Sequence, residues 1–336
     1  MTRTRSPRVD IHAHPGRCFL AGIPDTDPAR AVLGGDEAIA GFRRAHDAGM
    51  AAVSFATVAD LRVLQLVGSR FAAAREFAPG EAYADHQRQL EAIVDIARQV
   101  DATIVSGADD ITRLHDAGAT GLLVTCEGAD FVEDGPDADA FERVHEAYAS
   151  GVRSITIVHY RQNRYGDLQT EPPLHHGLSA AGRELVEVMN DVGLIVDLAH
   201  ASFETTRDAV AASRHPVMIS HSHLAGPRSD HPRLVTDEHA RIVSGAGGLI
   251  GAWPSGVVSE TLDDFIDEVI RLIEVVGVEH VAIGTDLDAN FRPVLTEYRQ
   301  FDDLDDGLAA RGFDATDIDR VLGRNAVELI RTVCGS

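Results

Sequence analysis

The sequence has 336 residues, of which 44% are hydrophobic and 25% charged, and its formal net charge is -23 at pH 7. This length and apolar content suit one large α/β barrel or two ordinary domains, each with a sizeable core. The negative charge argues against binding to nucleic acid or to anionic membrane surfaces, and no apolar run is long enough to span a bilayer.

The residue types present limit the catalytic mechanisms and the cellular compartment that are expected. The sequence contains no Lys, which excludes a Schiff-base mechanism and a carbamylated lysine bridging two metal ions. Its three cysteines, Cys18, Cys126 and Cys334, are too few and too scattered for a disulfide framework. The basic residues 1–8 are not followed by the apolar segment of a secretion signal. Together these features predict a cytoplasmic protein that does not bind membranes.

The first patterned stretch, residues 9–14, ends in two histidines. His12 and His14 are two residues apart, and side chains at i and i+2 of a strand point to the same face. Two neutral imidazoles aimed at one point make half of a transition-metal site. The alternative is an ordinary pair of histidines in a loop or on a half-buried strand.

The rest of the chain alternates between apolar strands and amphipathic helices. Such alternation predicts a parallel sheet covered on both faces, and eight units favour a (β/α)8 TIM-like barrel, a single domain over 1–336 with a C-terminal helical segment at about 301–336. A doubly wound open sheet is the rival, although the first strand–helix turn lacks the G-x-G-x-x-G pattern of dinucleotide-binding sheets. The segment from about residue 57 to about residue 79 is ambiguous, and 102–105 is a candidate ninth strand. The predicted strands are 9–14, 51–56, 121–126, 152–158, 194–198, 216–220, 248–253 and 281–285, and the predicted helices include 36–48, 81–100, 137–150, 179–190, 203–212, 236–243, 262–276 and 315–333.

Polar residues close six of the eight predicted strands. In a parallel barrel these strand ends meet at one mouth, where active sites lie. Each residue alone would be an ordinary loop or helix-capping residue, but together they predict a metal site. They are His12 and His14 after the first strand, Glu127 after the third, His159 after the fourth, His200 after the fifth, His221 after the sixth and Asp286 after the eighth.

This set of imidazoles and carboxylates can hold two divalent ions. Two neighbouring ions need a bridging anion, and without Lys the candidate is Glu127. Imidazole-rich ligation favours Zn2+, with manganese, cobalt and iron as alternatives. A hydroxide held between the ions would be a nucleophile at neutral pH, Asp286 could accept and return its proton, and His159 could stabilise the oxyanion. The prediction is metal-assisted hydrolysis of an amide, ester or related bond.

Several motifs then resemble the membrane (renal-type) dipeptidase family of zinc peptidases, within the wider amidohydrolase-like metal-dependent hydrolases. The most specific one runs from Gly177 to His200, and the others are Ile219-Ser220-His221-Ser222, Asp230-His231-Pro232-Arg233, Glu127-Gly128, Gly284-Thr285-Asp286-Leu287-Asp288 and Gly323-Arg324-Asn325. The resemblance implies a TIM-like barrel that hydrolyses dipeptides with two zinc ions. By position it implies that His12 and His14 bind the first ion, that Glu127 bridges, that His200 and His221 bind the second, that His159 polarises the scissile carbonyl, that Asp286 shuttles the proton and that Arg233 binds the substrate carboxylate.

Four features depart from the family pattern. His14 stands where the family usually has an Asp, Tyr160 and Leu234 each stand where Asn is usual, and the segment 18–79 contains few residues of the family's motifs. The leading hypothesis is a zinc dipeptidase; the second is a related amidohydrolase acting on N-acyl amino acids, lactones or other small amides; the third is a non-catalytic metal-binding barrel. The expected partner is a small-molecule substrate, and a homodimer is the hypothesis for the assembly.

Overall fold

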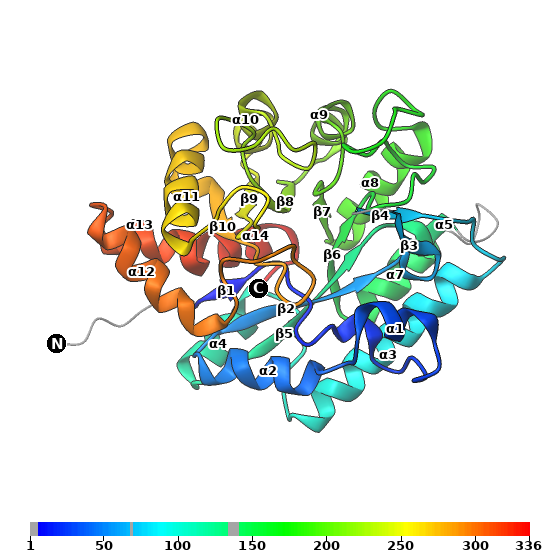
Figure 1. The fold of residues 1–336 in the computed structure, drawn as a ribbon, viewed down its shortest axis with the longest axis horizontal. Coiled ribbons are helices and arrows are strands. Elements are labelled where there is room, and N and C mark those ends of the chain that lie inside the picture. The colour runs from blue at the N-terminus through cyan, green and yellow to red at the C-terminus, as the bar shows by residue number, and fades with distance from the viewer. Residues whose placement is uncertain (1–5, 68–69, 134–140) are drawn as a thin grey trace.

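The computed structural model describes residues 6–67, 70–133 and 141–336. Its parallel strands close into a barrel in the order β1-β10-β9-β8-β7-β6-β5-β2, with helices on the outside (Figure 1). The predicted (β/α)8 barrel is therefore confirmed, and the doubly wound sheet is excluded. The barrel strands are β1 (Val9–Asp10), β2 (Ala52–Val58), β5 (Gly121–Glu127), β6 (Val152–Thr156), β7 (Ile195–Asp197), β8 (Met218–Ser222), β9 (Leu249–Ala252) and β10 (Val281–Ile283).

The helices follow the amphipathic stretches of the sequence. None of those in the described part of the chain combines the length and the hydropathy that crossing a membrane requires. They are α1 (Pro28–Leu33), α2 (Ala38–Asp47), α3 (Glu81–Gln99), α4 (Ala108–Asp116), α5 (Asp130–Glu133), α7 (Glu142–Ala149), α8 (Ala180–Val192), α9 (Phe203–Ala212), α10 (Asp237–Gly245), α11 (Leu262–Val276), α12 (Phe301–Ala310), α13 (Ala315–Asp319) and α14 (Asn325–Val333).

Helix α8 explains several residues of the motif from Gly177 to His200, the most specific motif of the sequence. The Ser179 side chain accepts a hydrogen bond from the Gly182 N–H and so caps the helix at its start, while Gly193 ends the helix at a φ of 82°. A Cβ at Gly182 would lie 2.1 Å from the carbonyl oxygen of Tyr165, so only glycine fits there. This stretch therefore fixes how α8 packs under the loop that precedes it.

Three sequence predictions need correction or restriction. The first strand is only Val9–Asp10, so His12 and His14 lie in the loop after it. The candidate ninth strand makes a single bridge from Ile104 to Leu122 and does not join the barrel. The helix predicted at 137–150 is described from Glu142, and residues 137–140 lie outside the described part.

The ambiguous segment forms part of the barrel mouth. It contains a 3-10 turn (Leu61–Val63) and an antiparallel hairpin of β3 (Leu64–Val67) and β4 (Arg70–Ala73). A small apolar cluster, separate from the main core, packs beneath it. The buried members of this cluster are Phe19, Leu20, Ile23, Val58 and Leu61.

Candidate metal centre

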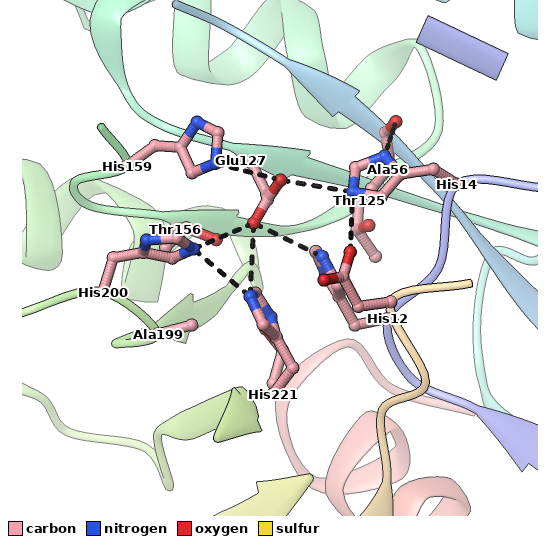
Figure 2. A network of polar contacts seen from close by, with 12 residues as sticks. His12, His14, Ala56, Thr125, Glu127, Thr156, His159, Ala199, His200 and His221 are labelled. Carbon is pink, nitrogen blue, oxygen red and sulfur yellow. Dashed lines mark hydrogen bonds and ion pairs between the residues drawn. The ribbon is translucent and has the colours of Figure 1, made fainter. Parts of the chain in front are cut away.

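Five buried imidazoles surround one buried carboxylate at the carboxyl ends of the strands. The carboxylate belongs to Glu127, the last residue of β5, and Figure 2 shows the five rings directed at its two oxygens. Glu127 Oε1 lies 3.4 Å from His12 Nε2, 3.3 Å from His200 Nε2 and 3.5 Å from His221 Nε2, and Oε2 lies 3.2 Å from His14 Nε2 and 3.3 Å from His159 Nε2.

The loop after β1 brings His12 and His14 to this point without a strand. The carboxylate of Asp10 accepts hydrogen bonds from the backbone N–H of His12 (3.3 Å) and of Thr285 (3.0 Å), which ties this loop to the one after β10. The ring of His14 contacts the Ala56 carbonyl through Nδ1 at 3.1 Å. A carbonyl can only accept, so Nδ1 carries the proton there. In the neutral ring, Nε2 then presents its lone pair to the centre.

His200 approaches from the loop after β7, and His221 approaches from near the end of strand β8. Their Nε2 atoms are 3.2 Å apart. The backbone of His200 has a φ of 66°, in the left-handed region that non-glycine residues rarely adopt. Such strain persists where the surrounding structure enforces it, and it is commonest at functional sites.

His159 has a partner that the sequence analysis did not identify. Asp60, which follows β2 and is fully buried, lies 2.7 Å through Oδ1 from Nδ1 of His159. Its Oδ2 accepts the backbone N–H groups of Tyr160 (2.9 Å) and Arg161 (3.0 Å). Burial opposes the charged ring, but the negative charges of Asp60 and Glu127 raise the pKa of His159 to about 9. Asp60 therefore fixes both the orientation and the charge of this imidazole.

Asp286 lies beside His14, in a strained backbone conformation with a φ of 53°. Its backbone N–H donates to the His12 carbonyl (2.8 Å), the indole of Trp253 donates to its Oδ2 (3.1 Å), and its Oδ1 lies 3.5 Å from His14 Nε2. Burial raises the pKa of Asp286, although the charges of His14 and His12 oppose the shift. The carboxylate is thus close enough to serve either as a proton carrier or as a ligand.

The charges of the cluster divide the histidines into two kinds. Burial, reinforced by the positive charge of Arg233, lowers the pKa of His200 well below its usual value, and burial next to His12 does the same to His221. Burial also opposes charge on His14, but contacts with Cys18 and Glu127 raise the pKa of this ring well above the usual value. Neutral imidazole is the form that binds metal. His200 and His221 are ready for a cation, whereas His14 would release a proton to it.

Arg233 is buried in the loop between β8 and α10. One terminal nitrogen of its guanidinium donates to Gln169 Oε1 (2.8 Å), and its central carbon lies 5.4 Å from the centre of the Trp253 ring. The other terminal nitrogen is buried with no hydrogen-bond partner among the described residues. An unpaired buried donor of this kind is costly, and a bound anion would satisfy it.

The cluster opens into a cavity of about 780 Å³. Glu127, His159 and Arg233 line its inner part, and α1 with the β3–β4 hairpin lines its outer part. The site is therefore a pocket large enough for a small organic substrate.

The donor set fits divalent metal ions. The Nε2 atoms of His12 and His14 are buried without a hydrogen-bond partner among the described residues, and both face carboxylate oxygens. Three groups of residues bring their ligand atoms within 4.8 Å of one another and could each hold an ion. They are His12, His14 and Asp286; His12, Glu127 and His221; and Glu127, His159 and His200.

All eight residues singled out from the sequence line or adjoin this pocket. Asp60 and Trp253 were not predicted from the sequence; they follow β2 and β9, the two strands without a predicted site residue. A search for polar or aromatic residues within three positions of every strand end would have found both. Asp60 did not stand out as a strand-end residue because β2 runs to Val58, two residues beyond its predicted end.

Comparison with known proteins gives matches over most of the chain. The profile of the membrane dipeptidase family (peptidase family M19) matches residues 45–334. Dipeptidase tcpJ of Claviceps purpurea is 30% identical over 235 residues, which cover 67% of this chain and 54% of the relative, so the match spans little more than half of that protein's length.

Solved structures share the fold at low sequence identity. A metallo peptidase from Rhodobacter sphaeroides, bound to a phosphinate mimic of the dipeptide L-Ala-D-Ala, superposes with a TM-score of 0.79 at 20% identity, covering 98% of this chain and 99% of the other. An amidohydrolase from Pseudomonas aeruginosa superposes with a TM-score of 0.76 at 22% identity, covering 98% and 97% of the two chains.

Proposed function

Because the chain belongs to the membrane dipeptidase family, we propose that it is a metal-dependent dipeptidase that holds two divalent ions, Zn2+ foremost, at its barrel mouth. The observation that carries the proposal is the convergence of five imidazoles on the two oxygens of Glu127. In this assignment, which follows the family resemblance, His12 and His14 would hold one ion, His200 and His221 would hold the other, and Glu127 would bridge them. When bound, the ions would supply Lewis-acid polarisation and a water of lowered pKa.

Asp286 is the proposed proton carrier. The Trp253 indole occupies its Oδ2, which leaves Oδ1 facing the centre beside His14. A carboxylate so placed can take a proton from the attacking water and give it to the leaving amine. The raised pKa of Asp286 supports this role, because a carboxylate that binds its proton more readily is a better base.

His159 is the proposed oxyanion donor. Asp60 holds its Nδ1 proton, so the remaining nitrogen, Nε2, faces the centre. A pKa of about 9 for His159 keeps a proton on Nε2 at neutral pH, ready to donate to a developing oxyanion.

Arg233 is the proposed carboxylate clamp. Its unpartnered guanidinium nitrogen supports this role, and a planar guanidinium pairs well with a carboxylate. A dipeptide has its free carboxylate a short, fixed distance from the scissile carbonyl, so one clamp both selects dipeptides and positions the bond for attack.

The test compares a dipeptide with its C-terminal amide on the wild type and on Arg233→Ala. Loss of the charge-assisted pair should cost about 2–5 kcal/mol in kcat/KM for the dipeptide. The amide, which has no carboxylate, should be a poor substrate of both proteins and should scarcely change. An equal loss on acid and amide would show that Arg233 supports the loop and does not bind the carboxylate.

A substrate panel separates the alternatives. Hydrolysis of N-acyl amino acids or lactones in preference to dipeptides would identify a related amidohydrolase. Absence of turnover on the whole panel by a metal-loaded protein would favour the non-catalytic barrel. The cytoplasmic location and the homodimer stay predictions from the sequence.

A further inference from the structure

The outer part of the cavity has an apolar wall with no part in the proposed chemistry. It comes from the 3-10 turn at Phe19, α1, the turn after β2 and the β3–β4 hairpin. Of these, the 3-10 turn and α1 lie before residue 45, where the match to the family profile begins. Two of its side chains, Val32 on α1 and Leu66 on β3, are 62% and 55% exposed. The other apolar members include Phe19, Leu33, Leu61, Leu64 and Phe71.

This wall begins beside the metal centre. The ring of Phe19 packs edge-on against the ring of His14, with 5.2 Å between the ring centres. On the other side of the cluster, Phe71 reaches Tyr160 (6.2 Å between ring centres), and Tyr160 packs against His159 (4.4 Å). The apolar surface is therefore continuous with the residues around the reacting bond.

The wall and Arg233 stand on opposite sides of the barrel mouth. The wall is carried by the segments after β1 and β2, which are neighbours in the barrel. Arg233 follows β8, which is separated from β1 by β9 and β10, and from β2 by β5, β6 and β7 (Figure 1). Glu127, the last residue of β5, lines the same cavity as Arg233 and the wall.

We propose that this wall binds a bulky apolar side chain on the amino-terminal residue of the substrate dipeptide. The proposal rests on the proposed function. A dipeptide whose carboxylate is held by Arg233 and whose scissile carbonyl lies at the cluster has its amino-terminal residue on the far side of the mouth, where the wall is. Binding would cover Val32 and Leu66, which removes apolar surface from water.

The charged side chains around the wall favour an apolar occupant. Arg62 is paired with Asp27 (2.8 Å), and Arg75 is paired with Glu81 through both carboxylate oxygens (2.7 and 2.6 Å). These cations are already neutralised by their partners, so they offer little to an acidic side chain. An acidic substrate side chain would lose its hydration against the wall and would gain no partner from Arg62 or Arg75. The other cation among the described residues that line this side of the cavity is Arg17.

The first experiment measures kcat/KM of the metal-loaded enzyme for four dipeptides: Leu-Ala, Ala-Ala, Asp-Ala and Ala-Leu. Leu-Ala should exceed Ala-Ala by about tenfold or more, the scale on which an apolar pocket distinguishes small changes in size. Asp-Ala should be the poorest substrate, and Ala-Leu should gain less than Leu-Ala. Equal values for Leu-Ala and Ala-Ala would overturn the inference and leave the proposed function intact, whereas no turnover of any of the four would overturn the proposed function.

The second experiment uses a matched pair of exposed leucines. Leu66→Ser should lower the ratio of kcat/KM for Leu-Ala over Ala-Ala by about threefold or more. Leu174→Ser is the control, because Leu174 is 61% exposed but lies outside the cavity lining. Both substitutions are at exposed positions, so the fold should be retained. An equal change of the ratio in the two variants, or none in Leu66→Ser, would contradict the assignment of the wall.

Discussion

Two groups of buried histidines in this barrel have similar burial but different surroundings. His86 on α3 and His223 after β8 are fully buried, and their ring nitrogens have no hydrogen-bond partner among the described residues. His86 stacks on Phe131, with 3.8 Å between ring centres, and burial lowers its pKa to about 3. Burial and the charge of Arg271 lower the pKa of His223 to about 3. Burial alone thus leaves an imidazole neutral and inert, whereas at the mouth the convergence on Glu127 makes a candidate site for cations.

His221 and His223 show how local this difference is. They are two residues apart, a spacing that puts side chains on the same face of a regular strand. Strand β8 ends at Ser222, and its register against β9 shifts between Ile219 and Ser222. His221 consequently faces Glu127, and His223 packs edge-on against Phe265 of α11. The same residue type at strand spacing is therefore insufficient evidence for a ligand.

The largest predicted effect is the loss of turnover when the metal is removed. It should depend on the residues around Glu127 and not on the buried histidines away from the mouth. Glu127→Ala deletes the carboxylate at the centre, so turnover should fall by about three orders of magnitude or more, since bound ions contribute several kcal/mol to catalysis. Chelation of the wild type should have the same result. His86→Leu is the matched control and should keep wild-type turnover. Full activity in metal-free wild-type protein would refute the metal-dependent mechanism.

A second prediction concerns the two roles open to Asp286. As a proton carrier it acts on chemistry more than on binding, so Asp286→Asn should lower kcat by about two to four orders of magnitude. Metal content, measured by elemental analysis, should stay near that of the wild type. Loss of an ion from this variant would instead identify Asp286 as a ligand, as its grouping with His12 and His14 allows.

A third prediction tests whether Asp60 acts through His159. Asp60→Asn keeps the size of the side chain but removes the charge that orients and protonates the ring, so kcat should fall about 10- to 100-fold, the usual cost of losing such a supporting partner. KM should change less. In a His159→Ala background the same substitution should cost almost nothing, because its target is gone. A full loss in that background would mean that Asp60 matters only for the backbone of Tyr160 and Arg161, which it also binds.

The smallest predicted effect concerns His86 and His223, the two buried histidines away from the mouth, and the stability of the protein in acid. Their pKa is about 3 in the folded chain and about 6.5 when unfolded, so above pH 6.5 both states are neutral and contribute nothing. Below pH 6.5 the unfolded chain binds protons that the folded chain does not, and stability falls until about pH 3. At pH 5 each of these histidines should lower the free energy of unfolding by about 2 kcal/mol. His86→Leu should show a shallower loss of stability between pH 6.5 and 5 in denaturant titrations, and an unchanged slope would contradict the account of burial.

Much of this arrangement could be predicted from the sequence, because the barrel follows from continuous apolar strands that alternate with amphipathic helices. The gathering of Glu127, His159 and His200 follows from the rule that the ends of parallel strands share one mouth. The contact between Asp60 and His159 joins residues 99 positions apart, and no local pattern marks it. The apolar wall was also not predicted, because the strands of the β3–β4 hairpin are too short to show a period.

The central claim is that the convergent imidazoles and Glu127 hold two ions, and metal stoichiometry tests it most directly. Protein freed of metal and titrated with Zn2+ should bind two ions per chain. The count should fall in Glu127→Ala and stay at two in His86→Leu. One ion at saturation in the wild type would show that His14, in place of the family's usual Asp, leaves a single-metal site. No binding, or binding that Glu127→Ala leaves unchanged, would contradict the claim.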